Sequence, residues 1–276
     1  MKKSVFIAEK PSVAQEFAKA LKVKTTRHDG YLESENTIVT WCVGHLVTMS
    51  YPEVYDIKYK RWTLETLPFL PGEFKYEVIP AVRKQFEIVS GLLNRADVET
   101  IYVCTDSGRE GEYIYRLVAQ MAGVKGKKEK RVWIDSQTEE EIIRGIKEAK
   151  DLSAYDNLSA SAYLRAKEDY LMGINFSRIL TLRYGNSVSN YLGNKYQVIS
   201  VGRVMTCVLG MVVRREREIR EFVKTPFYRV LGKFSLEGRS FEGEWRAVEG
   251  SRYFQSPDLY KENGFKDRKR AEELKG

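Results

Sequence analysis

Cysteine is scarce in this sequence. The three cysteines among 276 residues are far apart, at Cys42, Cys104 and Cys207. No two of them form a CxxC pair, so the spacing argues against a zinc ribbon and against a disulfide framework. This usage is typical of a protein in a reducing cytoplasm, and we expect that location.

Long apolar runs are also missing, and none approaches the roughly 20 residues that a membrane helix needs. The apolar stretch behind the first lysines extends only from Val5 to Ala8, where Glu9 and Lys10 end it. The start of the chain therefore does not read as an export signal. We expect no membrane partner.

Neither charge sign dominates the sequence. There are 46 Lys and Arg residues against 38 Asp and Glu residues, which gives a net charge of +8. So small an excess is only a weak indication of a polyanionic partner. Hydrophobic residues make up 43% and charged residues 30%, which excludes wholesale disorder and predicts a folded chain of one or two domains.

Strands and helices are predicted to alternate up to about residue 150. The apolar patterns predict strands at 4–8, 36–43 and 100–105, and helices at 11–21, 81–96, 109–121 and 139–150. The last of these helices is expected to begin with a capping box formed by Ser136 and Glu139. This alternation predicts an α/β fold with a mainly parallel, Rossmann-like sheet.

The pattern changes after residue 151. Two long helices are predicted, at about 155–184 and 201–222, and strand-like alternation returns from Thr225. We therefore expect three parts: an α/β domain over 1–150, a mainly helical domain over 151–222, and the start of a β-rich domain over 223–276.

Acidic residues follow two of the predicted strands. Glu9 follows the first strand, and Asp106 and Glu110 follow the strand at 100–105. Ligands of parallel α/β sheets bind at the carboxyl ends of strands, and carboxylates gathered there suit Mg²⁺. Crowded carboxylates repel one another, so one of them keeps a proton more readily unless a cation binds. These patterns make Asp106 and Glu110 candidate metal ligands, with Glu9 as a general acid and a further ligand.

A purely structural explanation stays open for each of these residues alone. Acids near a helix N-terminus are stabilised by the helix dipole, and most have no other role. Lys10 could likewise be an ordinary surface lysine. The combination favours a site, because Glu9 and Asp106 each lie between a strand and a helix although nearly a hundred positions separate them.

Several motifs together resemble the Toprim domain of type IA DNA topoisomerases, closest to the topoisomerase III branch. Two follow strands, Glu9-Lys-Pro-Ser12 and Thr105-Asp-Ser-Gly-Arg-Glu-Gly-Glu112, and the others are Gly44-His-Leu46, Tyr59-Lys-Arg-Trp62, Arg165-Ala-Lys-Glu-Asp169, Gly173-Ile-Asn175 and Ser200-Val-Gly-Arg-Val204. They occur in the family's order and cover most of residues 1–235. The sequence departs from the commoner form at Gly108, where many members have a second aspartate, so the resemblance implies a carboxylate-poor Mg²⁺ site.

The resemblance implies a mechanism. Type IA enzymes cut one DNA strand by attack of a tyrosine on phosphorus, pass another strand through the gap and reseal it without ATP. In this scheme Glu9 protonates the departing 3′-oxygen, Lys10 stabilises the scissile phosphate, and Asp106 and Glu110 hold Mg²⁺. Arg109 either contacts phosphate or pairs with a neighbouring acid.

The helical middle would correspond to the family's groove for single-stranded DNA, with Arg165, Asp169 and Arg203 at matching positions. Arg165 and Asp169 share a helix face, so the pair either contacts DNA or is only a structural ion pair. Arg203 follows Gly202 at a predicted helix start, which favours phosphate binding. His45 could face the active site or be a hydrogen-bonded structural residue.

The family's nucleophilic tyrosine has no matching motif in this sequence. Tyr59-Lys-Arg61 and Tyr163-Leu-Arg165 share only its first three letters. We therefore expect the tyrosine to lie beyond residue 276, in which case this chain is an amino-terminal part of a monomeric enzyme. The alternatives are a Toprim-containing nuclease that uses activated water, or a single-stranded DNA-binding module without cleavage activity.

Overall fold

The computed structural model describes residues 2–193 and 195–274, and it divides into two compact units, Met1–Thr206 and Cys207–Gly276. The boundary between them falls within helix α6 (Arg203–Arg220), and each unit is described by itself. Residues 1, 275 and 276, at the ends of the predicted parts, lie outside the described residues. The division into 1–150, 151–222 and 223–276 stays a prediction.

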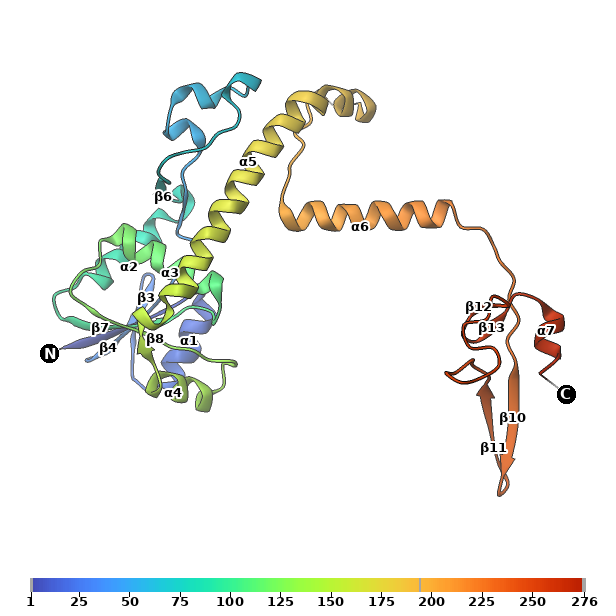
Figure 1. Ribbon diagram of the computed structural model, residues 1–276. Coiled ribbons are helices and arrows are strands. Elements are labelled where there is room, and N and C mark those ends of the chain that lie inside the picture. The colour runs from blue at the N-terminus through green and yellow to red at the C-terminus, as the bar shows by residue number, and fades with distance from the viewer. Residues whose placement is uncertain (1, 194, 275–276) are drawn as a thin grey trace. The chain divides into compact units, whose positions relative to one another are not determined.

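A seven-stranded sheet forms the centre of the first unit (Figure 1). Its strands lie in the order β2-β3-β4-β1-β7-β8-β9, and the four in the middle, β4, β1, β7 and β8, are parallel. The bounds are β1 (Lys3–Ala8), β2 (Thr26–His28), β3 (Tyr31–Glu33), β4 (Thr37–Trp41), β7 (Val98–Cys104), β8 (Lys128–Arg131) and β9 (Lys150–Asp151). The predicted mainly parallel α/β fold is confirmed.

Two apolar clusters cover the two faces of this sheet. Strand β1 contributes Val5 and Ile7 to one cluster and Phe6 and Ala8 to the other, because successive side chains of a strand point to opposite faces. The first cluster includes α2 (Arg83–Leu93), α3 (Arg109–Ala122) and part of α5 (Asp156–Leu192), and the second includes α1 (Pro11–Ala20) and α4 (Glu139–Lys147). Helices on both faces fix the sheet as the middle layer.

The start of α4 differs from its prediction. The helix begins at Glu139 with Thr138 at the N-cap, and Thr138 makes no side-chain capping hydrogen bond. Ser136 lies two residues further out, so the predicted capping box with Glu139 is wrong. Residues 150 and 151, which were expected to end this helix or follow it, instead form β9 against β8.

Residues 47–82 connect the sheet to α2. They contain β5 (Val47–Met49) paired with β6 (Tyr76–Val78), and four short 3₁₀ helices: η1 (Pro52–Val54), η2 (Ile57–Lys60), η3 (Leu64–Thr66) and η4 (Pro80–Val82). Asn175 of α5 holds this connection, since its side chain accepts from the Phe69 N–H at 2.6 Å and donates to the Phe69 carbonyl at 2.9 Å. The conformation of residues 64–70 is thus tied to α5.

The second unit contains a β hairpin and a small apolar cluster. Strands β10 (Leu231–Leu236) and β11 (Arg239–Glu244) are antiparallel, as are β12 (Leu259–Lys261) and β13 (Gly264–Phe265). Phe265 is fully buried, with Ala247, Tyr253 and Ala271 of α7 (Arg268–Glu272) in the same cluster. The predicted return of strands after residue 225 is confirmed.

Candidate active site at the sheet edge

Four neighbouring parallel strands end at one edge of the sheet, and each is followed by a polar residue. His45 follows β4, Glu9 follows β1, Asp106 follows β7, and Asp135 follows β8. A pocket of about 500 Å³ at this edge is lined by residues from Cys104 to Ser107 and from Ile134 to Gln137, with Val13 of α1. The arrangement is the one that parallel α/β sheets use to bind ligands.

Glu9 is a buried carboxyl group at this edge. The residue is only 7% exposed, and its Oε2 accepts a hydrogen bond from the Asp106 backbone N–H at 3.4 Å. Burial raises the pKa of Glu9, and the nearby negative charge of Asp106 raises it further. Glu9 is therefore more easily protonated than an ordinary glutamate, as a general acid requires.

The loop that carries Asp106 is held by a buried arginine. Arg131 of β8 is fully buried and donates from Nη1 to the carbonyls of Val103 and Thr105, and from Nη2 to the Asp106 carbonyl at 2.6 Å. Its Nε donates to Glu112 Oε2 at 3.0 Å, and Glu112 is also fully buried. The Arg131 guanidinium group thus joins the end of β7 to the start of α3 and fixes the backbone of Asp106.

Gly111 allows the loop to approach α3 closely. A Cβ atom at this position would lie 2.1 Å from the Asp106 carbonyl oxygen, which no side chain could tolerate without movement of the backbone. The Thr105 hydroxyl donates to the Gly111 carbonyl at 2.7 Å across the same contact. At Gly108 the backbone is extended and the space that a Cβ atom would occupy is open. A residue with a side chain would therefore fit at this position.

Glu110 lies at the same edge but is directed toward His45. Its Oε1 is 2.6 Å from His45 Nε2, and both side chains are partly exposed. Of the two alternatives for His45, this contact favours the one that faces the site. Arg109, the first residue of α3, and Lys10, at the N-cap of α1, are both exposed. The roles of Glu9, Lys10, Asp106, Arg109 and Glu110 stay predictions.

The donor set for a metal ion at this edge is small. Within 2–193 and 195–274, no group of three or more His, Cys, Asp or Glu side chains is arranged so that it could hold a metal ion. Glu9 and Asp106 still adjoin each other, as the effect of Asp106 on the pKa of Glu9 shows. One or two carboxylates, completed by water and phosphate oxygens, fit the usual coordination of Mg²⁺.

The predicted DNA-binding residues meet on α5 and at the start of α6. Asp169 accepts two hydrogen bonds from Arg203, from Nε at 2.9 Å and from Nη2 at 3.1 Å. These bonds, and the positive charge that they bring, lower the pKa of Asp169. Arg165 Nε is 4.0 Å from Asp169, so the expected Arg165–Asp169 pair is the looser of the two. All three side chains remain partly exposed.

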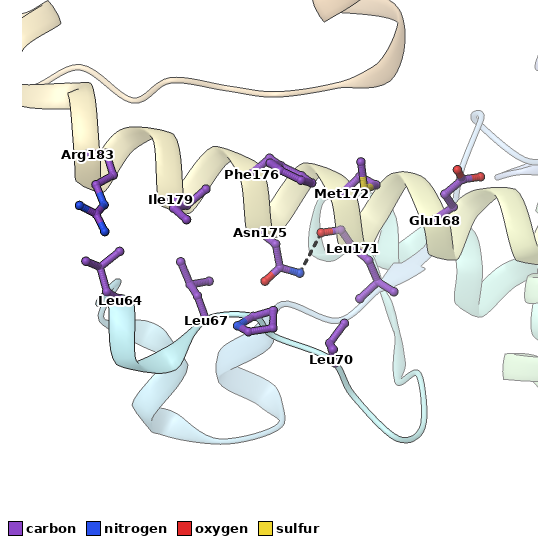
Figure 2. Close-up of a pocket in the computed structure, with 11 residues that line it drawn as sticks. Leu64, Leu67, Leu70, Glu168, Leu171, Met172, Asn175, Phe176, Ile179 and Arg183 are labelled. Atoms are coloured by element: carbon purple, nitrogen blue, oxygen red, sulfur yellow. Dashed lines mark hydrogen bonds between the residues drawn. The ribbon is translucent and has the colours of Figure 1, made fainter.

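An apolar pocket lies on another part of α5. It has a volume of about 640 Å³ and is formed between residues 64–70 and 168–183 (Figure 2). In Figure 2, Leu64, Leu67 and Leu70 lie on the side of α5 from which Leu171 and Ile179 project. Asn175, which binds the Phe69 backbone, also donates to the Leu171 carbonyl at 2.9 Å. Glu168 is the one carboxylate among its lining residues, so this pocket does not resemble a metal site.

The three cysteines of the chain are free thiols, with Cys42 and Cys104 buried and Cys207 exposed. Burial raises the pKa of Cys42 to about 12, so this thiol stays protonated at neutral pH. Among the described helices, none combines the length and apolar character needed to cross a membrane.

Two protein families match this chain. Residues 4–136 match the Toprim domain, and residues 153–275 match the DNA topoisomerase family. The motifs of the sheet edge lie within the first match, and Arg165, Asp169 and Arg203 lie within the second. Together the two matches cover most of the chain, and they support a type IA DNA topoisomerase of which this chain is a part.

Within that family, the chain is similar to bacterial proteins named DNA topoisomerase 3. It is 44% identical over 228 residues to the one from Bacillus thuringiensis (strain Al Hakam), a match that covers 83% of this chain and 30% of the relative. It is 42% and 40% identical over 254 residues to those from Shouchella clausii (strain KSM-K16) and Bacillus subtilis (strain 168), covering 92% of this chain and 33% of each relative. The chain thus spans about a third of the length of these proteins.

Sequence analysis missed some residues that shape the site. Arg131 is one, because its strand, Lys-Glu-Lys-Arg, has no apolar pattern. Asp135 is another, although its position shortly after a strand next to β7 follows the same rule that identified Glu9 and Asp106. Once β8 is recognised as a parallel neighbour of β7, an acid at the end of it is an expected part of the pocket.

Proposed function

We propose that this chain carries the Toprim and DNA-groove parts of a Mg²⁺-dependent type IA topoisomerase, which cuts single-stranded DNA, passes a strand and reseals the break. The observation that carries the proposal is the buried Glu9 carboxyl beside Asp106, at the carboxyl edge of the parallel sheet. Because the chain spans about a third of its relatives, the full reaction belongs to an enzyme whose nucleophilic tyrosine lies outside these 276 residues.

Glu9 supplies the proton in this scheme. Its raised pKa lets the carboxyl group hold a proton close to neutral pH more often than an exposed glutamate does, and it protonates the 3′-oxygen as the phosphodiester bond breaks. Lys10, exposed next to Glu9 at the N-cap of α1, is placed to neutralise charge on the scissile phosphate.

Asp106, with Glu9 or Glu110, would hold Mg²⁺ in this proposal. The ion supplies positive charge that positions the phosphate and favours resealing. Glu110 would have to leave His45 to join this set, whereas Arg131 and Gly111 keep the Asp106 backbone in place. Arg109 at the start of α3 is exposed and available for phosphate.

Arg165 and Arg203 would bind the backbone of single-stranded DNA, and Asp169 would orient Arg203 through the paired hydrogen bonds. Binding of this kind is driven by backbone charge and base stacking, so it tolerates different sequences. DNA is thus the proposed partner. A monomer that needs no ATP and acts in the cytoplasm remains the expectation.

The test uses Glu9→Gln in two settings. In the full-length enzyme, this change should suppress DNA cleavage at least tenfold, while single-strand binding by this chain stays nearly unchanged. A collapse of binding would show that Glu9 has a structural role instead. Glu16→Gln, at a partly exposed glutamate of α1 outside the pocket, is the matched control and should leave cleavage unchanged.

An assay on this chain alone distinguishes the nuclease alternative from the proposed topoisomerase. We expect it to bind single-stranded DNA and Mg²⁺ weakly, and neither to relax supercoiled DNA nor to cut a labelled oligonucleotide. Mg²⁺-dependent fragments that disappear in Asp106→Asn would favour a nuclease that uses activated water. Robust relaxation by the chain alone would contradict the proposed location of the tyrosine.

A further inference from the structure

His45 lies beside one predicted metal ligand and in contact with another. The backbone N–H of Gly44 donates to the Glu9 carbonyl at 3.3 Å, which places the loop after β4 next to the end of β1. From this loop the His45 side chain reaches α3, where its Nε2 is 2.6 Å from Glu110 Oε1. One imidazole ring therefore connects the loop beside Glu9 with the helix that follows Asp106.

The position of the His45 ring is fixed by its surroundings. Gly44 has a φ of 82°, a left-handed conformation that favours glycine and turns the chain just before His45. The next residue, Leu46, is fully buried, and its carbonyl accepts from the Ile79 N–H at 2.9 Å. The ring packs at a steep angle against Tyr113 of α3, with 6.1 Å between the ring centroids, and Tyr113 is itself buried. Both the backbone and the ring of His45 are thus held in place.

Glu110 is held less firmly than His45. It belongs to the first turn of α3, and its side chain is 72% exposed, so it can change direction without disturbing the core. In the part of the chain that the structure describes, no three His, Cys, Asp or Glu side chains form a group that could hold an ion. Glu110 in contact with His45 is therefore too far away to share an ion with Glu9 and Asp106.

We propose that His45 is a positioning residue that competes with Mg²⁺ for Glu110. The imidazole holds the carboxylate away from Glu9 and Asp106, and Glu110 becomes a further ligand only when it leaves His45. The inference rests on the proposed function, because it assumes that Mg²⁺ binds where Glu9 and Asp106 meet. Since the His45–Glu110 contact favours the arrangement with fewer ligands, its loss should strengthen binding of the ion.

The experiment measures binding of Mn²⁺, used as a probe for the Mg²⁺ site, from the electron paramagnetic resonance signal of the free ion. His45→Phe keeps an aromatic ring beside Tyr113 and removes the nitrogen that contacts Glu110. We expect this change to raise the affinity of the chain for Mn²⁺ about threefold, which is the factor that one partly exposed charged contact contributes.

His28→Phe is the matched control. His28 is the other histidine of the sequence, and it stacks on Tyr31 with 4.6 Å between the ring centroids. It belongs to β2, the strand at one edge of the sheet, and β3 and β4 separate it from β1. The control should therefore leave the affinity for Mn²⁺ unchanged.

A double variant identifies the side chain that is released. In a Glu110→Gln background, His45→Phe should not alter the affinity for Mn²⁺, because the carboxylate that it would free is no longer present. Circular dichroism checks that each variant is folded. If His45→Phe does not fold, His45→Leu takes its place in both backgrounds.

An unchanged or lower affinity for Mn²⁺ in the folded His45 variant would overturn the inference, because the contact would then not oppose the ion. An equal rise in the Glu110→Gln background would overturn it as well. In either case, Mn²⁺ binding by the wild-type chain that Asp106→Asn abolishes would leave the proposed function intact. If the wild-type chain binds no Mn²⁺, both this inference and the proposed Mg²⁺ site are wrong.

Discussion

Glu9 shows how position changes the chemistry of one residue. An exposed glutamate is fully ionised at neutral pH, but burial and the charge of Asp106 both raise the pKa of Glu9. The hydrogen bond from the Asp106 N–H and the proximity of Lys10 and His45 act in the opposite direction without reversing the effect. The same neighbours thus prepare Glu9 to hold a proton and keep its carboxylate close to a site for a cation.

We expect the pKa of Glu9, measured by side-chain carbon NMR, to lie above the ordinary value of 4.5. Asp106→Asn should lower it only part of the way, since burial is the larger cause and remains. Glu16→Gln, an exposed change on α1, should leave it unaltered. An ordinary Glu9 titration in the wild-type chain would contradict the assignment of Glu9 as the acid.

The raised pKa also makes stability depend on pH. The folded chain binds a proton on Glu9 more tightly than the unfolded chain does, so Glu9 lowers the free energy of unfolding as pH rises from 4.5 through the folded pKa. Glu9→Gln should therefore be more stable than wild type at pH 7 and similar to it below pH 4.5. Urea unfolding at the two pH values measures this, and a variant that is less stable at pH 7 would contradict it.

Arg131 carries the largest structural role of any single charged residue at the site. Arg131→Met leaves Glu112 with one buried partner fewer and removes the donors to three carbonyls around Asp106, so we expect a loss of about 3–5 kcal/mol of unfolding free energy. Arg144→Met, which breaks exposed ion pairs on α4, should cost no more than about 1 kcal/mol. Similar losses for both variants in urea unfolding would show that the buried Arg131 guanidinium group adds no more stability than an exposed ion pair.

At the scale of elements, the turn from β7 into α3 is the part that tolerates the least change in its residues. Gly111 approaches the backbone of Asp106, and the Thr105 hydroxyl donates to the Gly111 carbonyl, so the direction of the Asp106 carboxylate depends on the start of α3. Arg131 of β8 adds a bond from the neighbouring strand. The candidate metal ligand is therefore positioned by two elements besides its own.

Gly111→Ala tests this turn. The added methyl group would overlap the Asp106 carbonyl, and we expect a loss of about 1–3 kcal/mol together with weaker Mg²⁺ binding. Gly91→Ala is the matched control, because no atom lies within 4 Å of its added Cβ on α2. That control should be neutral or more stable by up to about 1 kcal/mol. A stable Gly111→Ala variant with normal Mg²⁺ binding would show that the close approach is unnecessary.

The elements that could be predicted are those in which apolar residues recur at the spacing of a strand or a helix. Strands β1 and β7 and helices α1, α2, α3 and α5 have such a spacing, and Glu9 and Asp106 were predicted as site residues because they follow such strands. Strands β2, β8 and β9 are short and charged, so pairing with neighbours rather than their own pattern makes them strands. The capping box failed for the related reason that a spacing does not fix where a helix begins.

At the scale of the whole molecule, contacts between distant residues complete the sites. The His45–Glu110 contact and the Arg178–Trp62 stack join residues 65 and 116 positions apart, and no local pattern predicts either of them. The resemblance to the family indicated candidate segments, whose roles stay predictions, and the comparisons support the family. What it could not supply is the pairing within those segments, such as Asp169 with Arg203 rather than chiefly with Arg165.

The central claim is that Mg²⁺ binds where Glu9 and Asp106 meet. The most direct measurement is paramagnetic line broadening by Mn²⁺, used as a substitute for Mg²⁺, in amide NMR spectra of the isotope-labelled chain. The account predicts that the amides of Asp106, Ser107 and Lys10 broaden first, that excess Mg²⁺ reverses the effect, and that Asp106→Asn abolishes it. Broadening that begins elsewhere, or that persists unchanged in Asp106→Asn, would contradict the account.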